Sequence, residues 1–262
     1  SGPIGRIAAA NGIPLVLQEQ NSYAGITNKL LARHASKICV AYDNMERYFP
    51  AGKIIKTGNP IRQDLLNPKV DKDAAREYFK LLAQYSKVIL VLGGSGGARQ
   101  INQSILKHLE TIRNQPDVAI LWQTGKNYYK EANRQAGEAG LPNLKVFDFI
   151  TRMDYAFALA DLVITRSGAG TISELGVIGK PALFVPSPNV AEDHQTRNAM
   201  ALVEKGAAEM VPDKEAPEKL IIQALTLVSD DNKLLEMANN IRQFGIPNAA
   251  EVIAHEAVQL IH

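Results

Sequence analysis

Short apolar runs alternate with longer segments of helical periodicity along almost the whole chain, and this alternation restricts the possible folds more than any other feature. The run at 87–92 is apolar after its first residue, as a strand buried on both faces of a sheet should be. A single long helix is predicted further on, where apolar residues recur at Ile101, Ile105, Leu109 and Ile112. Strands that alternate with helices predict an α/β fold with parallel sheets covered by helices on both faces.

A segment rich in glycine and proline at 58–62, Gly-Asn-Pro-Ile-Arg, is the best candidate for a linker. It predicts two doubly wound parallel-sheet domains with a cleft between them. We expect residues 1–60 to belong to the first domain, 61–245 to form the second, and 246–262 to form a C-terminal helix that packs back on the first. Because the chain opens on a helix and not on a strand, we expect the first domain to be incomplete at its N-terminus.

Composition excludes several classes of function. The net charge is +2, from 29 basic and 27 acidic residues, and no long basic run is present, so a nucleic-acid partner is not indicated. The single cysteine, Cys39, lies in an apolar run and excludes a disulfide framework, which suits a reducing cytoplasm. The sequence contains no apolar stretch long enough for a membrane span and no signal peptide.

The stretch Arg166–Glu174 follows the apolar run 162–165 and leads into a helical segment. Its glycines, Gly168 and Gly170, are expected to let the backbone turn tightly and to leave room for a ligand. The free N–H groups of the helix start would then face an anion, and a diphosphate fits best. Glu174, one turn along, can accept hydrogen bonds from a ribose diol. The alternative is an ordinary turn with a first-turn Glu favoured by the helix dipole, and this stretch alone does not separate the two.

A second glycine-rich turn, Gly93–Gly97, follows the buried run 87–92. Ala98 and Arg99 stand where a Walker A motif needs Lys and Ser or Thr, so an ATPase P-loop is not indicated. No clear acidic residue ends the next strand, so a dinucleotide fingerprint is not indicated either. Ser95 remains as a donor toward phosphate, with a tight structural turn as the alternative.

Four further polar positions are candidates. Arg62 is placed to reach from the linker into the cleft, although a solvated arginine is an equal alternative. The segment 193–198 begins a helix and could present polar side chains to a sugar or simply cap it. His194 has no Cys or His at metal-ligand spacing, so no metal site is predicted there. Asn21 follows the strand predicted at 14–17. Together these residues indicate a nucleoside diphosphate ligand with a ribose clamp and no covalent nucleophile.

Five motifs in register carry a family resemblance across essentially the whole chain. They are Gln18-Glu19-Gln20-Asn21 with Ala24-Gly25, Gly58-Asn59-Pro60-Ile61-Arg62, Gly93-Gly94-Ser95, Arg166-Ser167-Gly168-Ala169 through Glu174, and Pro181-Ala182-Leu183-Phe184-Val185-Pro186. The chain resembles the glycosyltransferase family 28 enzymes that add N-acetylglucosamine (GlcNAc) during peptidoglycan synthesis. The resemblance implies the two-domain GT-B fold. It also implies inverting transfer from UDP-GlcNAc to lipid I, the undecaprenyl-diphosphate-linked muramyl-pentapeptide, to give lipid II.

The resemblance also implies roles for individual residues. Glu174 corresponds to the ribose acceptor, Arg62 and Ser95 to phosphate contacts, and Ile150 to the residue whose main chain reads the uracil edge. Gln195 and Asn21 correspond to sugar contacts. The positions that hold the diphosphate and sugar are Ala169, Gly170, Thr171, Ile172 and Ser173. No metal or other cofactor is implied.

The chain departs from the family pattern at three places. A glycine-rich turn with the candidate general base is expected upstream of Ser1, together with most of a membrane-docking patch, so no catalytic base is assigned and this chain is expected to show little turnover. Gln18 stands where many members have His, and Gly170 replaces a larger residue. The family acts peripherally at the cytoplasmic face of the bacterial inner membrane. A UDP-sugar-binding module and a GT-B UDP-GlcNAc epimerase remain as alternatives.

Overall fold

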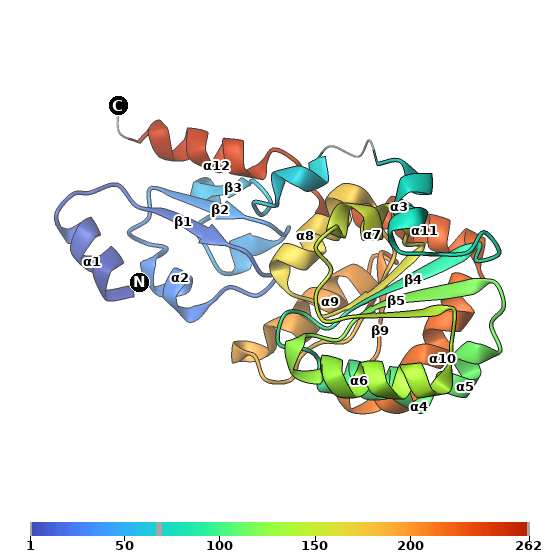
Figure 1. The fold of residues 1–262 in the computed structure, drawn as a ribbon. Coiled ribbons are helices and arrows are strands. Elements are labelled where there is room, and N and C mark those ends of the chain that lie inside the picture. The colour runs from blue at the N-terminus through green and yellow to red at the C-terminus, as the bar shows by residue number, and fades with distance from the viewer. Residues whose placement is uncertain (1, 67–69, 261–262) are drawn as a thin grey trace.

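The computed structural model describes residues 2–66 and 70–260, and its first part contains a small parallel sheet (Figure 1). The three strands lie in the order β1-β2-β3. This part comprises α1 (Gly2–Ala10), β1 (Val16–Glu19), α2 (Ile26–Leu31), β2 (Lys37–Val40) and β3 (Ile54–Lys56). Two short 3-10 turns, η1 (Met45–Arg47) and η2 (Ala51–Lys53), complete it.

The second part contains a parallel sheet of six strands in the order β6-β5-β4-β7-β8-β9. The strands are β4 (Lys87–Leu92), β5 (Val118–Gln123), β6 (Leu144–Phe147), β7 (Leu162–Thr165), β8 (Ala182–Phe184) and β9 (Ala208–Met210). From β4 the chain first builds outward through β5 and β6, and then returns to the other side of β4 with β7. The order therefore reverses between β4 and β7, which is the topological switch point where sheets of this kind bind ligands.

Helices cover both faces of the six-stranded sheet, as Figure 1 shows with α4, α6 and α10 on one side and α3, α7 and α8 on the other. The predicted α/β fold with doubly wound parallel sheets is confirmed. The helices are α3 (Lys72–Tyr78), α4 (Arg99–Lys107), α5 (Leu109–Arg113), α6 (Lys126–Ala139), α7 (Met153–Leu159), α8 (Ala169–Ile178), α9 (His194–Val203), α10 (Ala216–Val228), α11 (Asp231–Ile241) and α12 (Ala249–Val258). The remaining 3-10 turns are η3 (Gln63–Leu66), η4 (Ala191–Asp193), η5 (Asp213–Glu215) and η6 (Arg242–Phe244).

Two local predictions differ from the structure. The long helix predicted from Ile101 to Ile112 is broken into α4 and α5 at His108, whose φ of −111° and ψ of 25° are not helical. The His108 ring Nδ1 lies 2.9 Å from the Ser104 carbonyl oxygen, a local side-chain bond that competes with the helix ladder. The strand predicted at 14–17 is β1, which starts and ends two residues later and so includes Gln18 and Glu19. Asn248 occupies the N-cap position of α12 but makes no capping hydrogen bond with its side chain.

The C-terminal helix α12 runs along the three-stranded sheet (Figure 1). The Lys37 ammonium on β2 forms an ion pair with the Glu256 carboxylate on α12. At the linker, Gly58 has a φ of +75° and faces the Ile246 side chain so closely that a Cβ on Gly58 would lie 2.7 Å from the Ile246 Cβ. Of the helices described, none is both long enough and apolar enough to span a bilayer.

Candidate functional site

The two glycine-rich turns lie side by side at the switch point. Leu92 ends β4, Thr165 ends β7, and these two residues are partners in the register of the parallel pair. The turns that follow them, 93–97 and 166–168, therefore leave the sheet at the same level and on adjacent strands. The topology thus brings together two segments that lie about seventy residues apart in the sequence. A ligand at this edge of the sheet would be bordered by both turns.

The glycines of the two turns have different physical roles. Gly97 has a φ of +88°, and a Cβ on neighbouring Gly125 would lie 2.2 Å from the Gly97 nitrogen, so close backbone approach requires glycine there. Gly168 has a φ of −68° and a ψ of 146°, which any residue can adopt. The prediction that a tight turn requires glycine is therefore wrong at this position. A Cβ on Gly170 would meet no atom within 4 Å. At Gly168 and Gly170 the absence of a side chain leaves open space above the helix.

The start of α8 presents main-chain N–H groups to this space. Gly168 is the N-cap and supplies no side-chain oxygen to cap the helix. The side chain of Ile172 is buried and its N–H donates to the Gly168 carbonyl within the helix, so its contact with the donor stays a prediction. Ser173 is also buried, and its Oγ accepts a hydrogen bond from Asn59 Nδ2 at 3.1 Å. The groups left to face an anion are the N–H groups of the first turn, from Ala169 to Thr171.

Glu174 and Arg62 form an ion pair across the linker. Arg62 Nε donates to Glu174 Oε1 at 2.9 Å, and the two side chains are 48% and 19% exposed. This geometry uses one nitrogen of the guanidinium and one oxygen of the carboxylate. Both Nη groups of Arg62 and the second oxygen of Glu174 have no hydrogen-bond partner among residues 2–66 and 70–260, so each side chain can still meet a ligand while holding the other in place.

Asn21 lies at the contact between the two parts of the molecule. Its Oδ1 accepts a hydrogen bond from Asn198 Nδ2 on α9 at 3.0 Å. The Oδ1 of the fully buried Asn198 in turn accepts from both the N–H and the Oγ of Ser22. The buried Glu19 carboxylate accepts from the Asn21 and Gly25 N–H groups and thereby fixes this loop. From the sequence, Asn198 is a candidate only as part of the segment 193–198. The feature that could have indicated its role is an asparagine at a core-facing position of a helix.

Ile150 is held by a residue that sequence reasoning also missed. The Ile150 N–H donates to Oε1 of Gln123, the buried last residue of β5, at 2.9 Å. The Ile150 N–H group is thus already engaged within the protein. In the part of the chain that the structure describes, its carbonyl has no donor, so the carbonyl is the group that can accept a hydrogen bond from a base.

A cavity of about 470 Å³ lies beside the turn 93–97, and Gln195 forms part of its wall. Gln195 Oε1 accepts a hydrogen bond from the Ser187 N–H, which leaves its side-chain NH2 for a ligand. Arg166, which also lines this cavity, donates to the Val185 and Pro186 carbonyls and to Asp213, so its role here is to hold the loop after β8. Ser95 is exposed at the tip of the first turn.

The reversed strand order, the paired turns and the carboxylate one turn into α8 define a nucleotide-binding protein of the GT-B class. The family model of the glycosyltransferase family 28 C-terminal domain matches residues 88–253. The chain belongs to glycosyltransferase family 28, in the branch of the UDP-N-acetylglucosamine–N-acetylmuramyl-(pentapeptide) pyrophosphoryl-undecaprenol N-acetylglucosamine transferases.

The relatives of that name are close. The one from Bacteroides thetaiotaomicron is 54% identical over 99% of this chain and 70% of its own length. The one from Parabacteroides distasonis is 52% identical over 100% of this chain and 70% of its own. The crystal structure of Acinetobacter baumannii MurG has a TM-score of 0.78 and 33% identity, over 99% of this chain and 70% of that one. A UDP-GlcNAc 2-epimerase from Neisseria meningitidis, at 17% identity and a TM-score of 0.68, shares the fold.

Proposed function

We propose that this chain holds UDP-GlcNAc in the cleft between its two parts, for transfer of GlcNAc to lipid I. The observation that carries this is the uncapped N-terminus of α8 at the switch point, with Glu174 one turn along and paired to Arg62. A diphosphate fits the N–H groups of Ala169, Gly170 and Thr171, where the positive end of the helix dipole lies. We also propose the division into domains 1–60 and 61–245 with a C-terminal helix at 246–262.

The remaining donor contacts are those that the family resemblance implies, and the positions of the side chains support them. The free oxygen of Glu174 accepts from the ribose hydroxyls, and the Nη groups of Arg62 meet phosphate together with Ser95. The Ile150 carbonyl accepts the N3–H of uracil. The GlcNAc hydroxyls lie toward the Gln195 NH2 group and Asn21. In these roles the ion pair of Arg62 and Glu174 orients both the diphosphate and the ribose of the nucleotide.

The chemistry is a direct displacement. The acceptor hydroxyl attacks the anomeric carbon of GlcNAc from the face opposite to the diphosphate, a general base of the first domain takes its proton, the bond to the UDP oxygen breaks, and the configuration inverts. Negative charge grows on the departing diphosphate, so the helix N–H groups and Arg62 stabilise the transition state more than the ground state. In a transfer assay with a lipid I analogue, little turnover is expected from this chain, because no general base is assigned in it; GlcNAc transfer at a substantial rate would exclude a UDP-sugar-binding module.

Calorimetry of UDP, UDP-GlcNAc and dTDP tests the donor site. Glu174→Ala should weaken UDP binding by about 1–3 kcal/mol, because the ribose hydroxyls and Arg62 lose their partner. Glu218→Ala is the matched control, since Glu218 is also ion-paired but lies on α10, away from the cleft, and it should bind UDP as the parent does. Equal affinity of the parent for UDP and dTDP, or an unchanged affinity in Glu174→Ala, would contradict the assignment.

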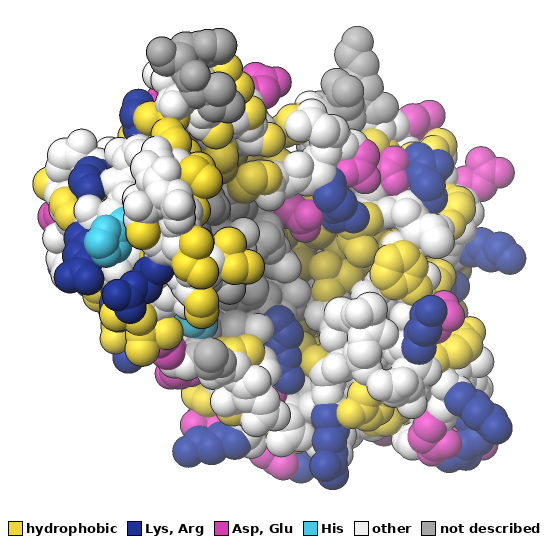
Figure 2. Space-filling model, turned by 90° about the vertical axis from the view of Figure 1, so that its left-hand side faces the viewer, with side chains coloured by type: hydrophobic (Ala, Val, Ile, Leu, Met, Phe, Trp, Pro, Cys, Tyr) yellow, Lys and Arg dark blue, Asp and Glu magenta, His cyan; other side chains and the backbone are white. Residues whose placement is uncertain are grey.

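The membrane-facing surface is a second part of the proposal. Ile4 and Ile7 on α1 and Leu30 on α2 are 74%, 65% and 66% exposed. Figure 2 views the molecule from the side of these helices and shows hydrophobic side chains next to Lys and Arg. Apolar side chains next to cations suit the anionic cytoplasmic face of the inner membrane. The Ile7→Ser/Leu30→Ser variant should sediment less with anionic vesicles than the parent; equal sedimentation would contradict this surface.

A further inference from the structure

A second cavity, of about 490 Å³, lies at the end of α8 opposite to the proposed donor site. The donor meets the first turn of α8 at Ala169, whereas this cavity is lined by Val177 and Ile178 from the last turn. Ten residues of helix separate the two ends by about 15 Å. None of the residues assigned to the donor lines this cavity, and its volume falls in the range of small-ligand pockets.

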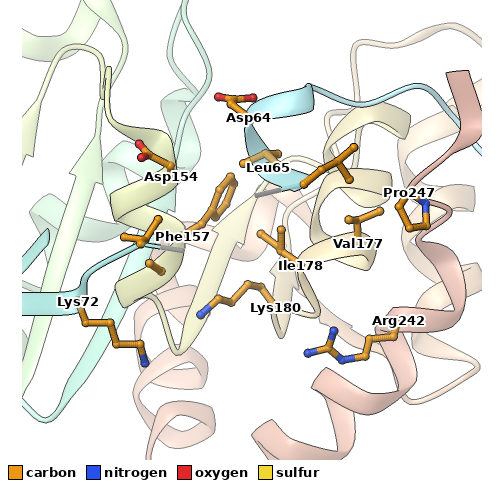
Figure 3. A pocket seen from close by; sticks show the side chains of 13 residues that line it. Asp64, Leu65, Lys72, Asp154, Phe157, Val177, Ile178, Lys180, Arg242 and Pro247 are labelled. Carbon is orange, nitrogen blue, oxygen red and sulfur yellow. The ribbon is translucent and has the colours of Figure 1, made fainter. Parts of the chain in front are cut away.

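Cationic and acidic side chains line opposite sides of this cavity (Figure 3). Lys72, Lys180 and Arg242 extend into one side of it, from the start of α3, from the residue after the α8 C-cap and from η6. Asp64 and Asp154 lie at the opposite side, with apolar side chains between, among them Leu65, Phe157 and Ile178. A ligand in this cavity meets positive charge at one end and apolar surface along its length.

The three cations have no ion-pair partner among residues 2–66 and 70–260. The Asp154 carboxylate is already held by Arg152 at 2.7 Å. The pKa of Lys180 is lowered to about 8, mainly because the ammonium is buried; the charge of Asp161 opposes this effect, and the charges of Lys72 and Arg242 add to it. The two carboxylates of this cavity lie on its opposite side, so three like charges share one side without an ion pair, and an anion there relieves their repulsion.

A hydrogen bond to the end of α7 accounts for only one of the donors that these three cations carry. Lys180 Nζ donates to the carbonyl of Ala160, the C-cap residue of α7, at 2.6 Å. That bond satisfies an orphan carbonyl at a negative helix end and accounts for one of the three ammonium hydrogens. Two donors of Lys180 remain, and Lys72 and Arg242 make no such bond in the described part of the chain.

We propose that this cavity binds an amphiphilic anion, a phosphate monoester or carboxylate joined to a short apolar chain. The anionic group lies against the three cations, Lys72, Lys180 and Arg242, where it replaces cation repulsion with charge-assisted hydrogen bonds. The apolar chain lies against Phe157 and Ile178. An inorganic anion leaves the apolar wall in water, and a neutral amphiphile leaves the cations unpaired, so neither satisfies both halves of the cavity.

Calorimetry on this chain with n-octyl phosphate below its micelle concentration tests the proposal. Octanoate is a second anion, inorganic phosphate lacks the tail, and octyl glucoside lacks the charge. We expect octyl phosphate to bind about tenfold or more tightly than inorganic phosphate and octyl glucoside, and to bind equally in the presence of saturating UDP. Phosphatidate vesicles, compared with octyl phosphate, distinguish a lipid surface from a soluble source of the same head group.

Variants locate the bound probe. Lys180→Met and Lys72→Met should each weaken octyl phosphate about tenfold, because each removes one charged donor. Lys72 is exposed at the start of α3, so its variant keeps the test valid if Lys180→Met fails to fold. Lys219→Met on α10 is the control and should bind as the parent does. Three results would overturn the proposal. Octyl glucoside could bind as tightly as octyl phosphate, UDP could displace octyl phosphate, or octyl phosphate could bind unchanged to both Lys180→Met and Lys72→Met.

Discussion

The three-stranded and six-stranded parts of this molecule follow the same rule of alternating strands and helices, but they are enclosed to different degrees. Every residue of β5, in the middle of one half of the larger sheet, is buried. In β1 of the smaller sheet only alternate residues are buried, and β3 has no buried residue. Both sheets have helices on both faces, but α1 and α2 of the smaller part expose large apolar side chains to solvent.

The cores differ in the same way. One apolar cluster, which includes Ile120 and Trp122, is confined to the six-stranded part. The other includes Ile38 of the smaller sheet and continues without interruption into α7 and α8 of the larger part. The six-stranded part therefore has a core of its own, and the three-stranded part shares its core with its neighbour. The proposed donor site shows the same difference. Most of its contacts lie on the six-stranded part, and the three-stranded part contributes where it contacts the six-stranded part.

Matched core deletions should separate the two parts most strongly. Ile120→Ala and Ile38→Ala remove the same atoms from two fully buried positions on β5 and β2. Trp122, the only tryptophan, reports the six-stranded part, so its fluorescence follows the unfolding of that part alone. Ile120→Ala should lower the free energy of unfolding seen by fluorescence by about 2–5 kcal/mol, and Ile38→Ala by much less. Equal shifts would show one cooperative unit.

The two parts should also differ in how stability depends on pH. Lys180 is half-buried without an ion pair and has a pKa of about 8 against 10.5 when unfolded, whereas Lys37 is paired with Glu256. Between pH 8 and 10.5 the unfolded state therefore holds more protons at Lys180 than the native state, and this group makes stability rise with pH. Lys180→Met should remove a rise of about 2–3 kcal/mol in urea titrations. Lys37→Met should retain that rise; its loss there would contradict the assignment.

The contact between the parts can be broken at one residue. Asn198→Ala leaves the buried Ser22 N–H and Oγ without their acceptor, which should cost about 1–2 kcal/mol of unfolding free energy. Because Asn198 also holds Asn21, UDP-GlcNAc affinity should fall while UDP affinity stays the same. Asn240→Ala, which removes a half-buried bond to the Gly206 carbonyl far from the contact, is the control. A parallel loss of UDP affinity would show that the two parts are more tightly coupled than we propose.

The smallest effect is expected at the exposed helices. Ile7→Ser should change the free energy of unfolding by no more than about 0.5 kcal/mol, because the side chain is 65% exposed. The buried Leu31 on α2 is the contrast, since Leu31→Ala should cost several times more. Thermal melts of both variants test this. A large loss in Ile7→Ser would mean that α1 contributes to a core and would remove the basis for its proposed role at the membrane.

The sequence alone determined the local elements. The strand predicted at 87–92 is β4 with the same bounds, because an almost wholly apolar run followed by glycines is a signal contained within a few residues. The same holds for β7 and for the glycine-rich turns that follow both strands. The family, and with it the positions of the proposed donor contacts, came from motifs in register and not from physical reasoning on single residues. Ile150 shows this, since nothing in its own chemistry marks it.

Only the tertiary structure decided which of these elements meet. Strand order places β4 beside β7, and so joins the turns 93–97 and 166–168, because pairing between distant strands depends on the packing of the whole sheet. The pair of Arg62 and Glu174 and the bond from Asn198 to Asn21 join residues more than a hundred positions apart, beyond the reach of any local pattern. The cavity around Lys180 likewise arises from segments far apart in the sequence that pack against one another. Local chemistry set the elements, and long-range packing made the sites.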